Sequence, residues 1–395
     1  MRAFVFTDKS LARHAGRFVW LEIDTEKREN AALRRRLQVP ALPTFFILDP
    51  ADERVALRWV GGATVRQLDQ ILDEGRLAVA RGAAGADTAG TRGGAKLARA
   101  ASAADLAFAQ AERHYGAGDM AAAAADYRRA LAAAPPGWPR YARAVESALF
   151  ALQESDDNEA VALLARDAFP TLRATPSSAN VAASGIGGAL ALPKDHPKRR
   201  ELVRALEADA EAVVRDPEAK VAADDRSGAY IALLDIRHDE GDSTGAMNVA
   251  SRWSAFLDGE AAKATAREQR TVFDAHRLSA YLEIGHPERA IPMLEASERD
   301  FPEDYNPPAR LATAYKAMKR WDDALAASDR ALARAYGPRK LRLLQTRSEI
   351  QIGRGDAAAA RRTLEEAVAM AEALPEGQRS ESTIASLKKQ LSALP

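Results

Sequence analysis

Three related segments in the C-terminal part of the sequence decide the fold. They read YLEIGHPERAIPML (residues 281–294), YKAMKRWDDALAAS (315–328) and QIGRGDAAAARRTL (351–364). The tenth residue of each is alanine; Ala290 and Ala324 are 34 positions apart, and Ala360 follows 36 positions later. Self-similarity at a period of about 34 residues is typical of stacked helix–turn–helix units. The stretch Thr271–Pro375 is therefore predicted to be a helical repeat array.

The residue types at fixed positions in these segments have a structural reason. An alanine early in the second helix lets the first helix approach closely, and Leu294 or Leu364, four positions later, fills the space toward the next unit. Gly285 and Gly355 supply the positive φ that ends the first helix, and Pro302 stops the second. This stretch resembles the tetratricopeptide repeat family, which implies an α-solenoid with a groove for a protein or peptide partner.

More degenerate copies of the repeat extend toward the N-terminus. Ala104–Pro135 forms the clearest of them, with Gly118-Asp119 at its turn. Pro170 is expected to stop a helix of the next unit, because a proline cannot continue a helical hydrogen-bond ladder. Residues 104–395 are therefore predicted to form a tetratricopeptide-type solenoid of six or seven helical hairpins in a curved, right-handed array.

Residues 1–75 predict a small α/β unit. Five elements are expected in order: a buried strand at 17–24, a helix at 26–38, strands at 45–48 and 54–60, and an amphipathic helix at 64–72. Together with Leu42-Pro43-Thr44, Asp49-Pro50 and Gly61-Gly62, this order resembles the thioredoxin fold from its second strand onward. The resemblance implies a cis peptide bond before Pro43.

The first strand of that family and its Cys-x-x-Cys motif are missing, and the sequence has no cysteine. Without the first strand, Phe18–Leu21 and Phe45–Leu48 lose a neighbour for their backbone groups. Three explanations stay open. Met1 is an internal methionine of a longer protein with the cysteines upstream, Ala3–Phe6 replaces the missing strand, or a decayed domain is supported by the repeats. The first explanation is favoured.

The stretch 76–103 predicts a flexible linker. It consists mainly of Ala, Gly, Thr and Arg and has almost no large apolar residue, so it buries too little surface to offset the entropy lost on ordering. The predicted organisation is thus a thioredoxin-like domain over residues 1–75, this linker, and the solenoid over residues 104–395.

Charge and hydropathy exclude several classes of partner. Lys and Arg together number 56, as do Asp and Glu, so the formal net charge is zero. Such a balance argues against general binding of nucleic acids or anionic membranes, which requires a basic surface. No apolar run approaches the roughly 20 residues of a membrane span, and no signal peptide is recognised. We expect a cytoplasmic protein, or a periplasmic one if an N-terminal extension carries an export signal.

Motifs for catalysis are absent from the sequence. The six histidines form no His-x-x-x-His or His-Glu-x-x-His pair, and there is no Gly-x-Ser-x-Gly. Ser184–Gly188 is glycine-rich, but it lies in a helical context without a βαβ unit, which favours close helix packing over a nucleotide fingerprint. No catalytic residue, metal or cofactor is therefore expected.

Binding residues can be proposed from the repeat phase. Some tetratricopeptide domains hold a C-terminal carboxylate with Lys, Asn and Arg on the first helices of their repeats. The candidates at such positions are Asn306, Arg310, Lys316 and Arg342. The full clamp pattern is absent, which favours another peptide or protein in the groove.

The predicted function is a protein–protein interaction scaffold with a redox-inactive thioredoxin-like domain. The alternative is a thiol–disulfide oxidoreductase whose Cys-x-x-Cys lies upstream of a misassigned start, with Pro43 against it. A third hypothesis is a structural scaffold that associates with itself.

Overall fold

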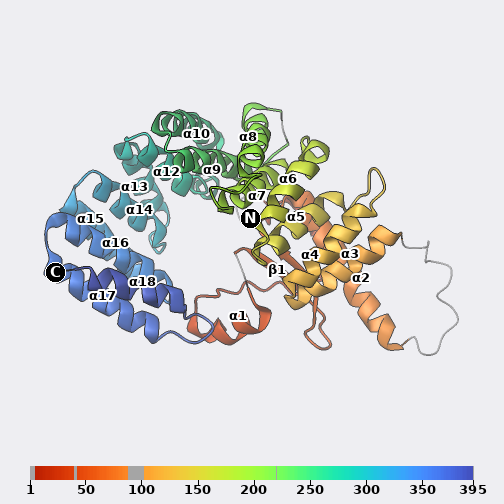
Figure 1. The fold of residues 1–395 in the computed structure, drawn as a ribbon. Coiled ribbons are helices and arrows are strands. Elements are labelled where there is room, and N and C mark those ends of the chain that lie inside the picture. The colour runs from red at the N-terminus through yellow and green to blue at the C-terminus, as the bar shows by residue number, and fades with distance from the viewer. Residues whose placement is uncertain (1–4, 40–41, 88–101, 219, 395) are drawn as a thin grey trace. The chain divides into compact units, whose positions relative to one another are not determined.

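The computed structural model describes residues 5–39, 42–87, 102–218 and 220–394 (Figure 1). The chain divides into two compact units. Residues 1–18 and 40–249 make up the N-terminal unit, and residues 19–39 and 250–395 make up the C-terminal unit. Residues 19–39 thus belong to a different unit from the residues that precede and follow them.

The N-terminal unit begins with a short 3-10 helix, two strands and a long helix. These are η1 (Lys9–His14), β1 (Thr44–Leu48), β2 (Val55–Val60) and α2 (Val65–Asp87). The strands form a two-stranded antiparallel sheet in which Phe45 is opposite Trp59. Leu68 and Ile71 of α2 are fully buried in one cluster with Leu57 of β2. The Leu42–Pro43 bond is cis, the conformation that the resemblance implies.

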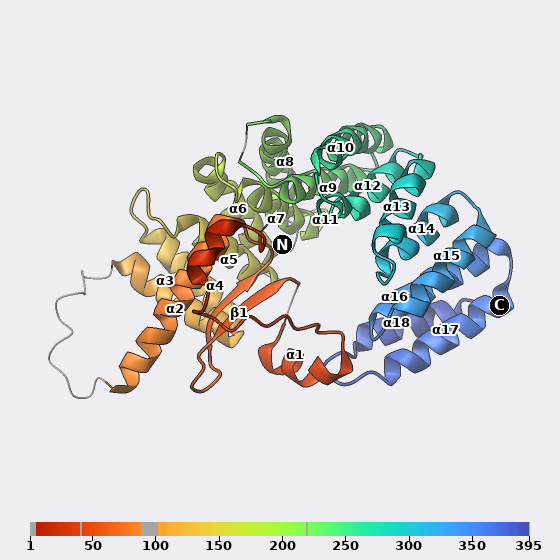
Figure 2. The ribbon, with the colours of Figure 1, turned by 180° about the vertical axis from the view of Figure 1, so that it is seen from behind.

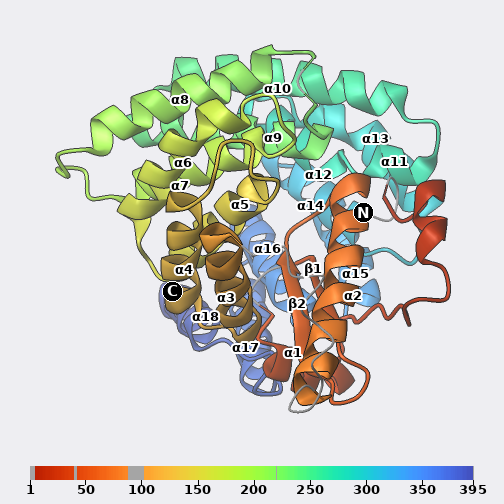
Figure 3. The same ribbon diagram turned by 90° about the vertical axis from the view of Figure 1, so that its right-hand side faces the viewer.

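The sheet and α2 pack on the first helical repeats of this unit. The buried Arg143 of α5 (Tyr141–Gln153) forms ion pairs with Glu74 of α2, at 2.9 Å, and with Glu112 of α3 (Ala103–Ala117). Its guanidinium also lies 5.2 Å from the ring centroid of Trp59 in β2. In Figure 3, β2 lies between α2 and α3. One arginine therefore connects the sheet, α2 and two helices of the repeats.

The strand expected at residues 17–24 does not form. Val19 and Leu21 are 87% and 76% exposed, and the described part of the chain has no strand in this stretch. The physical reason is that an apolar run becomes a buried strand only beside a partner strand that satisfies its backbone groups. The described sheet contains β1 and β2 alone. The described residues thus contain only a two-stranded sheet where a thioredoxin-like domain was expected, and that fold is not confirmed.

Part of the expected linker is helical, since α2 continues from Val65 to Asp87 instead of ending near Leu72. Alanine is the best helix former and is frequent in residues 76–87, which accounts for the extension. Residues 88–101 of the expected linker lie outside the described residues. The division of residues 1–103 into a separate domain and a linker stays a prediction.

Three helix pairs follow in the N-terminal unit. They are α3 with α4 (Met120–Ala132), α5 with α6 (Asn158–Leu172), and α7 (Ser178–Ala191) with α8 (Arg199–Arg215). Gly118 ends α3 with φ +83°, as its place at the predicted turn requires. Pro170 lies inside α6, two residues before its end, so the prediction that it stops the helix was slightly wrong. In α7, a Cβ on Gly185 would lie 2.5 Å from that of Ala165, which confirms close helix packing around Ser184–Gly188.

Two longer helices continue the chain: α9 (Ala223–Glu240) and α10 (Ser243–Lys263). They are joined at Gly241, where φ is +69°. The boundary between the two units falls within α10 (Figure 2).

The C-terminal unit contains three further helix pairs and a last helix, together with residues 19–39. Its elements are η2 (Arg28–Asn30), α1 (Ala31–Leu37), α11 (Arg267–Thr271), α12 (Asp274–Glu283), η4 (Pro287–Arg289), α13 (Ala290–Asp300), α14 (Asn306–Ala317), α15 (Trp321–Arg334), α16 (Arg339–Arg354), α17 (Ala357–Glu372) and α18 (Glu381–Ser392). Consecutive helices from α12 to α17 pair in sequence order.

The predicted repeat positions are confirmed here. Ala290, Ala324 and Ala360 are completely buried, so each lies in a close helix contact. Gly285 and Gly355 have φ of +74° and +87°. Among the described residues after 102, six helix pairs form within the units. The protein thus has a tetratricopeptide-like helical repeat fold.

Candidate functional site

The start of α14 positions the first candidate residues. The backbone N–H and the side-chain Nδ2 of Asn306 both donate to Oδ1 of Asp304, at 2.9 and 2.8 Å. Pro307 and Pro308 follow in the first helical turn, where a missing N–H costs little. This local turn holds Tyr305 directly before the helix, half-buried, and points the chain into α14.

The positive charges of Arg310 and Arg342 both act on Tyr305, although the two arginines lie on α14 and α16. Burial raises the pKa of Tyr305, while the positive charges of Arg310 and Arg342 oppose the rise. Neither guanidinium forms a hydrogen bond or an ion pair with another described residue. We call Tyr305, Asn306, Arg310 and Arg342 the Tyr305 cluster. It presents two cations to a potential ligand.

Arg310 also lies near a buried carboxylate. Asp274 of α12 is completely buried, and its Oδ2 accepts a hydrogen bond of 2.5 Å from the Ser297 hydroxyl. Burial raises the pKa of Asp274, and the charges of Arg310, Arg277 and Arg270 act in the opposite direction. The charge of Arg310 thus acts on Asp274 as well as on Tyr305.

Arg339, at the start of α16, lies next to this cluster. Its guanidinium carbon is 5.5 Å from the ring centroid of Tyr305 and 4.6 Å from that of Tyr336. It forms ion pairs with two carboxylates of residues 19–39: Nε with Glu26, and Nη2 with both oxygens of Asp24 at 3.3 Å. The two tyrosine rings limit the rotation of the Arg339 guanidinium. Its N–H donors are therefore held in one orientation toward both carboxylates.

Two further side chains complete this contact. The Tyr336 hydroxyl donates to Asp24, and this hydrogen bond raises the pKa of Tyr336 to about 12. The buried Gln378, between α17 and α18, donates from Nε2 to the carbonyls of Thr25 and Lys27, at 3.1 and 2.9 Å. We call Asp24–Lys27 the acidic segment. Tyr336, Arg339 and Gln378 are its segment-binding surface.

Glycines allow the backbone of residues 19–39 to approach the repeats. A Cβ on Gly377 would lie 2.4 Å from the carbonyl oxygen of Ala31, and one on Gly337 would lie 2.4 Å from that of Glu26. An exposed ion pair of 2.5 Å between Arg35 and Glu376 lies beside the first of these approaches. Close backbone approach is thus built into both loops that meet the segment.

The structure does not bring all predicted site residues together. Lys316 lies ten positions after Asn306 on α14, about 15 Å along the helix axis, and forms an ion pair with Glu349. Pro43 belongs to the N-terminal unit. The grouping of Asn306, Arg310, Lys316 and Arg342 as one peptide site stays a prediction, and the structure favours the three residues around Tyr305.

Sequence reasoning missed Tyr336, Arg339 and Gln378. A signal was present, since Asp24-Thr25-Glu26 follows an apolar run without a partner strand and carries two carboxylates at alternate positions. Its partners lie more than 300 residues away, so no local pattern connects them.

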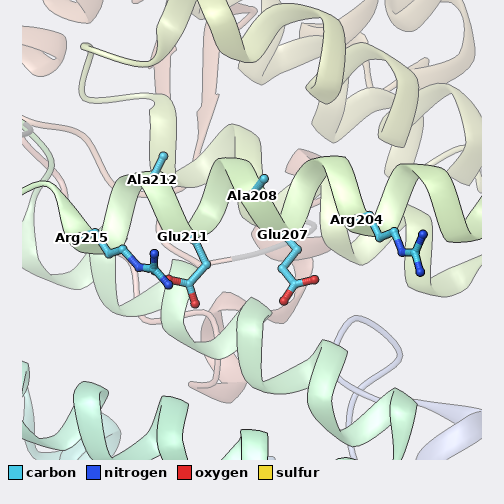
Figure 4. A pocket seen from close by; sticks show the side chains of 6 residues that line it. All are labelled: Arg204, Glu207, Ala208, Glu211, Ala212 and Arg215. Atoms are coloured by element: carbon cyan, nitrogen blue, oxygen red, sulfur yellow. The ribbon is translucent and has the colours of Figure 1, made fainter.

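A surface depression on α8 is a weaker candidate. All its lining residues come from that one helix: Arg204, Glu207, Ala208, Glu211, Ala212 and Arg215 (Figure 4). Glu207 forms an ion pair with Arg237 of α9, and Glu211 forms one of 2.8 Å with Arg215. One helix face with paired charges does not enclose a ligand. Within the described ranges, no group of three or more acidic or histidine side chains could hold a metal, and no helix is long and apolar enough to cross a membrane.

No family model and no curated protein matches the chain. Among solved structures, it is similar to a tetratricopeptide repeat protein from Parabacteroides merdae, with 12% identity, a TM-score of 0.45, and coverage of 73% of this chain and 99% of that one. It is also similar to the TPR2AB domain of yeast Sti1 in a pHSP90 complex, with 15% identity, a TM-score of 0.27, and coverage of 73% and 98%. The assignment of the repeat architecture rests on the helix pairs described above.

Proposed function

We propose that this protein is an interaction scaffold whose C-terminal repeats bind an acidic segment of a protein partner at the Tyr305 cluster. The observation that carries the proposal is that the charges of Arg310 and Arg342 both act on Tyr305, while neither arginine forms an ion pair with another described residue. Adjacent to them, Arg339 already holds two carboxylates of the chain itself. Arginines able to bind carboxylates are therefore also present beside Arg339, which already binds Asp24 and Glu26.

The physical basis is the strength of charge-assisted hydrogen bonds. An arginine can hold a carboxylate through two parallel N–H donors, and such bonds are about twice as strong as neutral ones. Arg342 is exposed and Arg310 is half-buried, so a ligand gains access without repacking of the helices. A carboxylate that reached both arginines would be held by two cations.

Direct peptide binding tests this proposal. The probe is a set of fluorescein-labelled peptides with Asp and Glu at varied spacing, each with a free or an amidated C-terminus, and binding to the full chain is measured by anisotropy. In Arg310→Gln/Arg342→Gln we expect affinity to fall about tenfold or more, because charge-assisted hydrogen bonds contribute about 1.5–3 kcal/mol each. Lys316→Gln is the matched control, since Lys316 is engaged with Glu349.

The outcome decides whether the Tyr305 cluster is a ligand site and which kind of carboxylate it binds. If no acidic peptide binds, or if the double substitution leaves the affinities unchanged, the Tyr305 cluster is not a ligand site. If only free C-termini bind, the cluster recognises a terminal carboxylate instead of an internal acidic segment.

For residues 1–75 we propose a structural role in place of a redox role. The sequence has no cysteine to support thiol chemistry, β2 packs on α3 of the first repeat, and β2 and α2 also contact Arg143 of α5. Terminal repeats of solenoids need a cap for their outer face. The sheet and α2 would serve as that cap, and a thioredoxin ancestry would explain their order and the cis bond at Pro43.

A further inference from the structure

We propose that the segment-binding surface is a site for a peptide turn with carboxylates at its first and third positions, and that Asp24–Lys27 is its built-in ligand. A partner with the same pattern would compete with the acidic segment for Tyr336, Arg339 and Gln378. The inference rests on the proposed function, because it specifies what kind of acidic segment the C-terminal repeats accept.

The contacts define the ligand. Residues 24–27 form a turn in which the Lys27 N–H donates to the Asp24 carbonyl at 3.3 Å, and the carboxylates of Asp24 and Glu26 both reach Arg339. Gln378 donates to the carbonyls of Thr25 and Lys27, which are also two apart. Carbonyl contacts are independent of side-chain identity. The surface therefore selects for a turn with acidic residues at its first and third positions.

The way residues 19–24 are presented favours a displaceable ligand over a permanent part of the fold. Val19, Leu21 and Ile23, immediately before the acidic segment, are 87%, 76% and 40% exposed. Asp24 and Glu26 are held by polar contacts, with about a quarter of each side chain exposed. Segments with few buried apolar contacts open with low free energies compared with the core.

Competition with a tethered ligand has a measurable effect. While the acidic segment occupies the surface, the affinity for an external peptide falls in proportion to the free fraction of sites. Weakening the internal ligand without touching the surface should therefore strengthen binding of the external peptide.

The experiment uses a fluorescein-labelled peptide with the sequence of residues 19–30, VWLEIDTEKREN, and anisotropy measurements on the full chain. Three proteins are compared: the natural sequence, Asp24→Asn/Glu26→Gln, and the same double variant with Arg339→Gln. The Asp24→Asn substitution keeps a side-chain oxygen for the backbone N–H of residue 26, which Asp24 accepts at 3.0 Å, so the local turn is preserved. Glu29→Gln/Glu365→Gln removes the same charge elsewhere in the C-terminal unit and serves as the control.

We expect the double variant to bind the peptide about tenfold more tightly than the natural sequence and the control do. Addition of Arg339→Gln should abolish that binding. Equal affinities for the natural sequence and the double variant would overturn the inference. So would binding that survives Arg339→Gln, or no binding to the double variant.

These outcomes are separable from failure of the proposed function. In the Asp24→Asn/Glu26→Gln background, Arg310→Gln/Arg342→Gln can be added. Peptide binding that requires Arg339 but ignores Arg310 and Arg342 would refute the Tyr305 cluster as the ligand site. The inference about the segment-binding surface would then stand alone.

Discussion

Gly377→Ala should release residues 24–31 from the C-terminal repeats. Its added Cβ would lie 2.4 Å from the carbonyl oxygen of Ala31, whereas ordinary contacts begin at 3.4 Å, so the backbones must separate by about 1 Å. The hydrogen bonds from Gln378 to Thr25 and Lys27 measure 3.1 and 2.9 Å, and the same displacement takes them beyond bonding range.

The size of the effect follows from those two bonds. Each contributes about 0.5–1.5 kcal/mol, so together they stabilise the bound segment by about 1–3 kcal/mol. The equilibrium fraction of released segment should therefore increase roughly 5- to 150-fold. The φ of Gly377 lies outside the left-handed region, so alanine introduces no strain other than this contact.

Brief trypsin digestion of the full chain measures the release. Cleavage after Lys27, quantified by mass spectrometry, should accelerate by the same factor when opening is fast compared with cleavage. Gly259→Ala in α10 is the control, because an added Cβ there would meet no atom within 4 Å. An unchanged cleavage rate in Gly377→Ala would refute the close packing of this segment on the loop before α18.

Three further predictions concern stability. Ala324→Glu should lower the free energy of unfolding by several kcal/mol, because Ala324 is fully buried in a helix contact; an unchanged Tm would contradict the repeat phase. Arg143→Ala should cost about 3–5 kcal/mol in chemical denaturation, since it leaves Glu74 and Glu112 without their cation, and a loss below about 1 kcal/mol would mean that the sheet and α2 do not depend on it. Burial raises the pKa of Glu146 to about 7, so the stability that its protonated form provides is present below about pH 4.5 and is lost as pH rises through 7. Glu146→Gln should flatten the dependence of the denaturation midpoint on pH between about 5 and 8, and an equally steep dependence in the variant would refute the assignment.

The register of the C-terminal repeats could be predicted from sequence because each determinant is local. A close helix contact requires a small residue, and this predicts the positions of Ala290, Ala324 and Ala360. The turn requires a positive φ, and this predicts the positions of Gly285 and Gly355. The repeat period also predicts that side chains about one repeat apart lie on neighbouring repeats. The charges of Arg310 and Arg342, 32 positions apart, act on the same tyrosine.

The fate of residues 17–24 could not be predicted in the same way. Apolar content predicts burial, but a strand also needs a neighbour, and that neighbour is a property of the whole chain. The binding partners of Asp24 and Glu26 are an arginine and a tyrosine at the other end of the sequence. Such pairs leave no periodic signal in a single sequence.

The extreme sequence separation within the C-terminal unit has a consequence for biosynthesis. Asp24 and Tyr336 are 312 positions apart, and Thr25 and Gln378 are 353 apart. At about 5–20 residues per second, the segment leaves the ribosome roughly 18–70 s before its binding surface is complete. During that interval the apolar run at residues 18–23 has no docked neighbour to hold it. Glu22, Asp24 and Glu26 then serve as gatekeeper charges against aggregation, before two of them become ligands of Arg339.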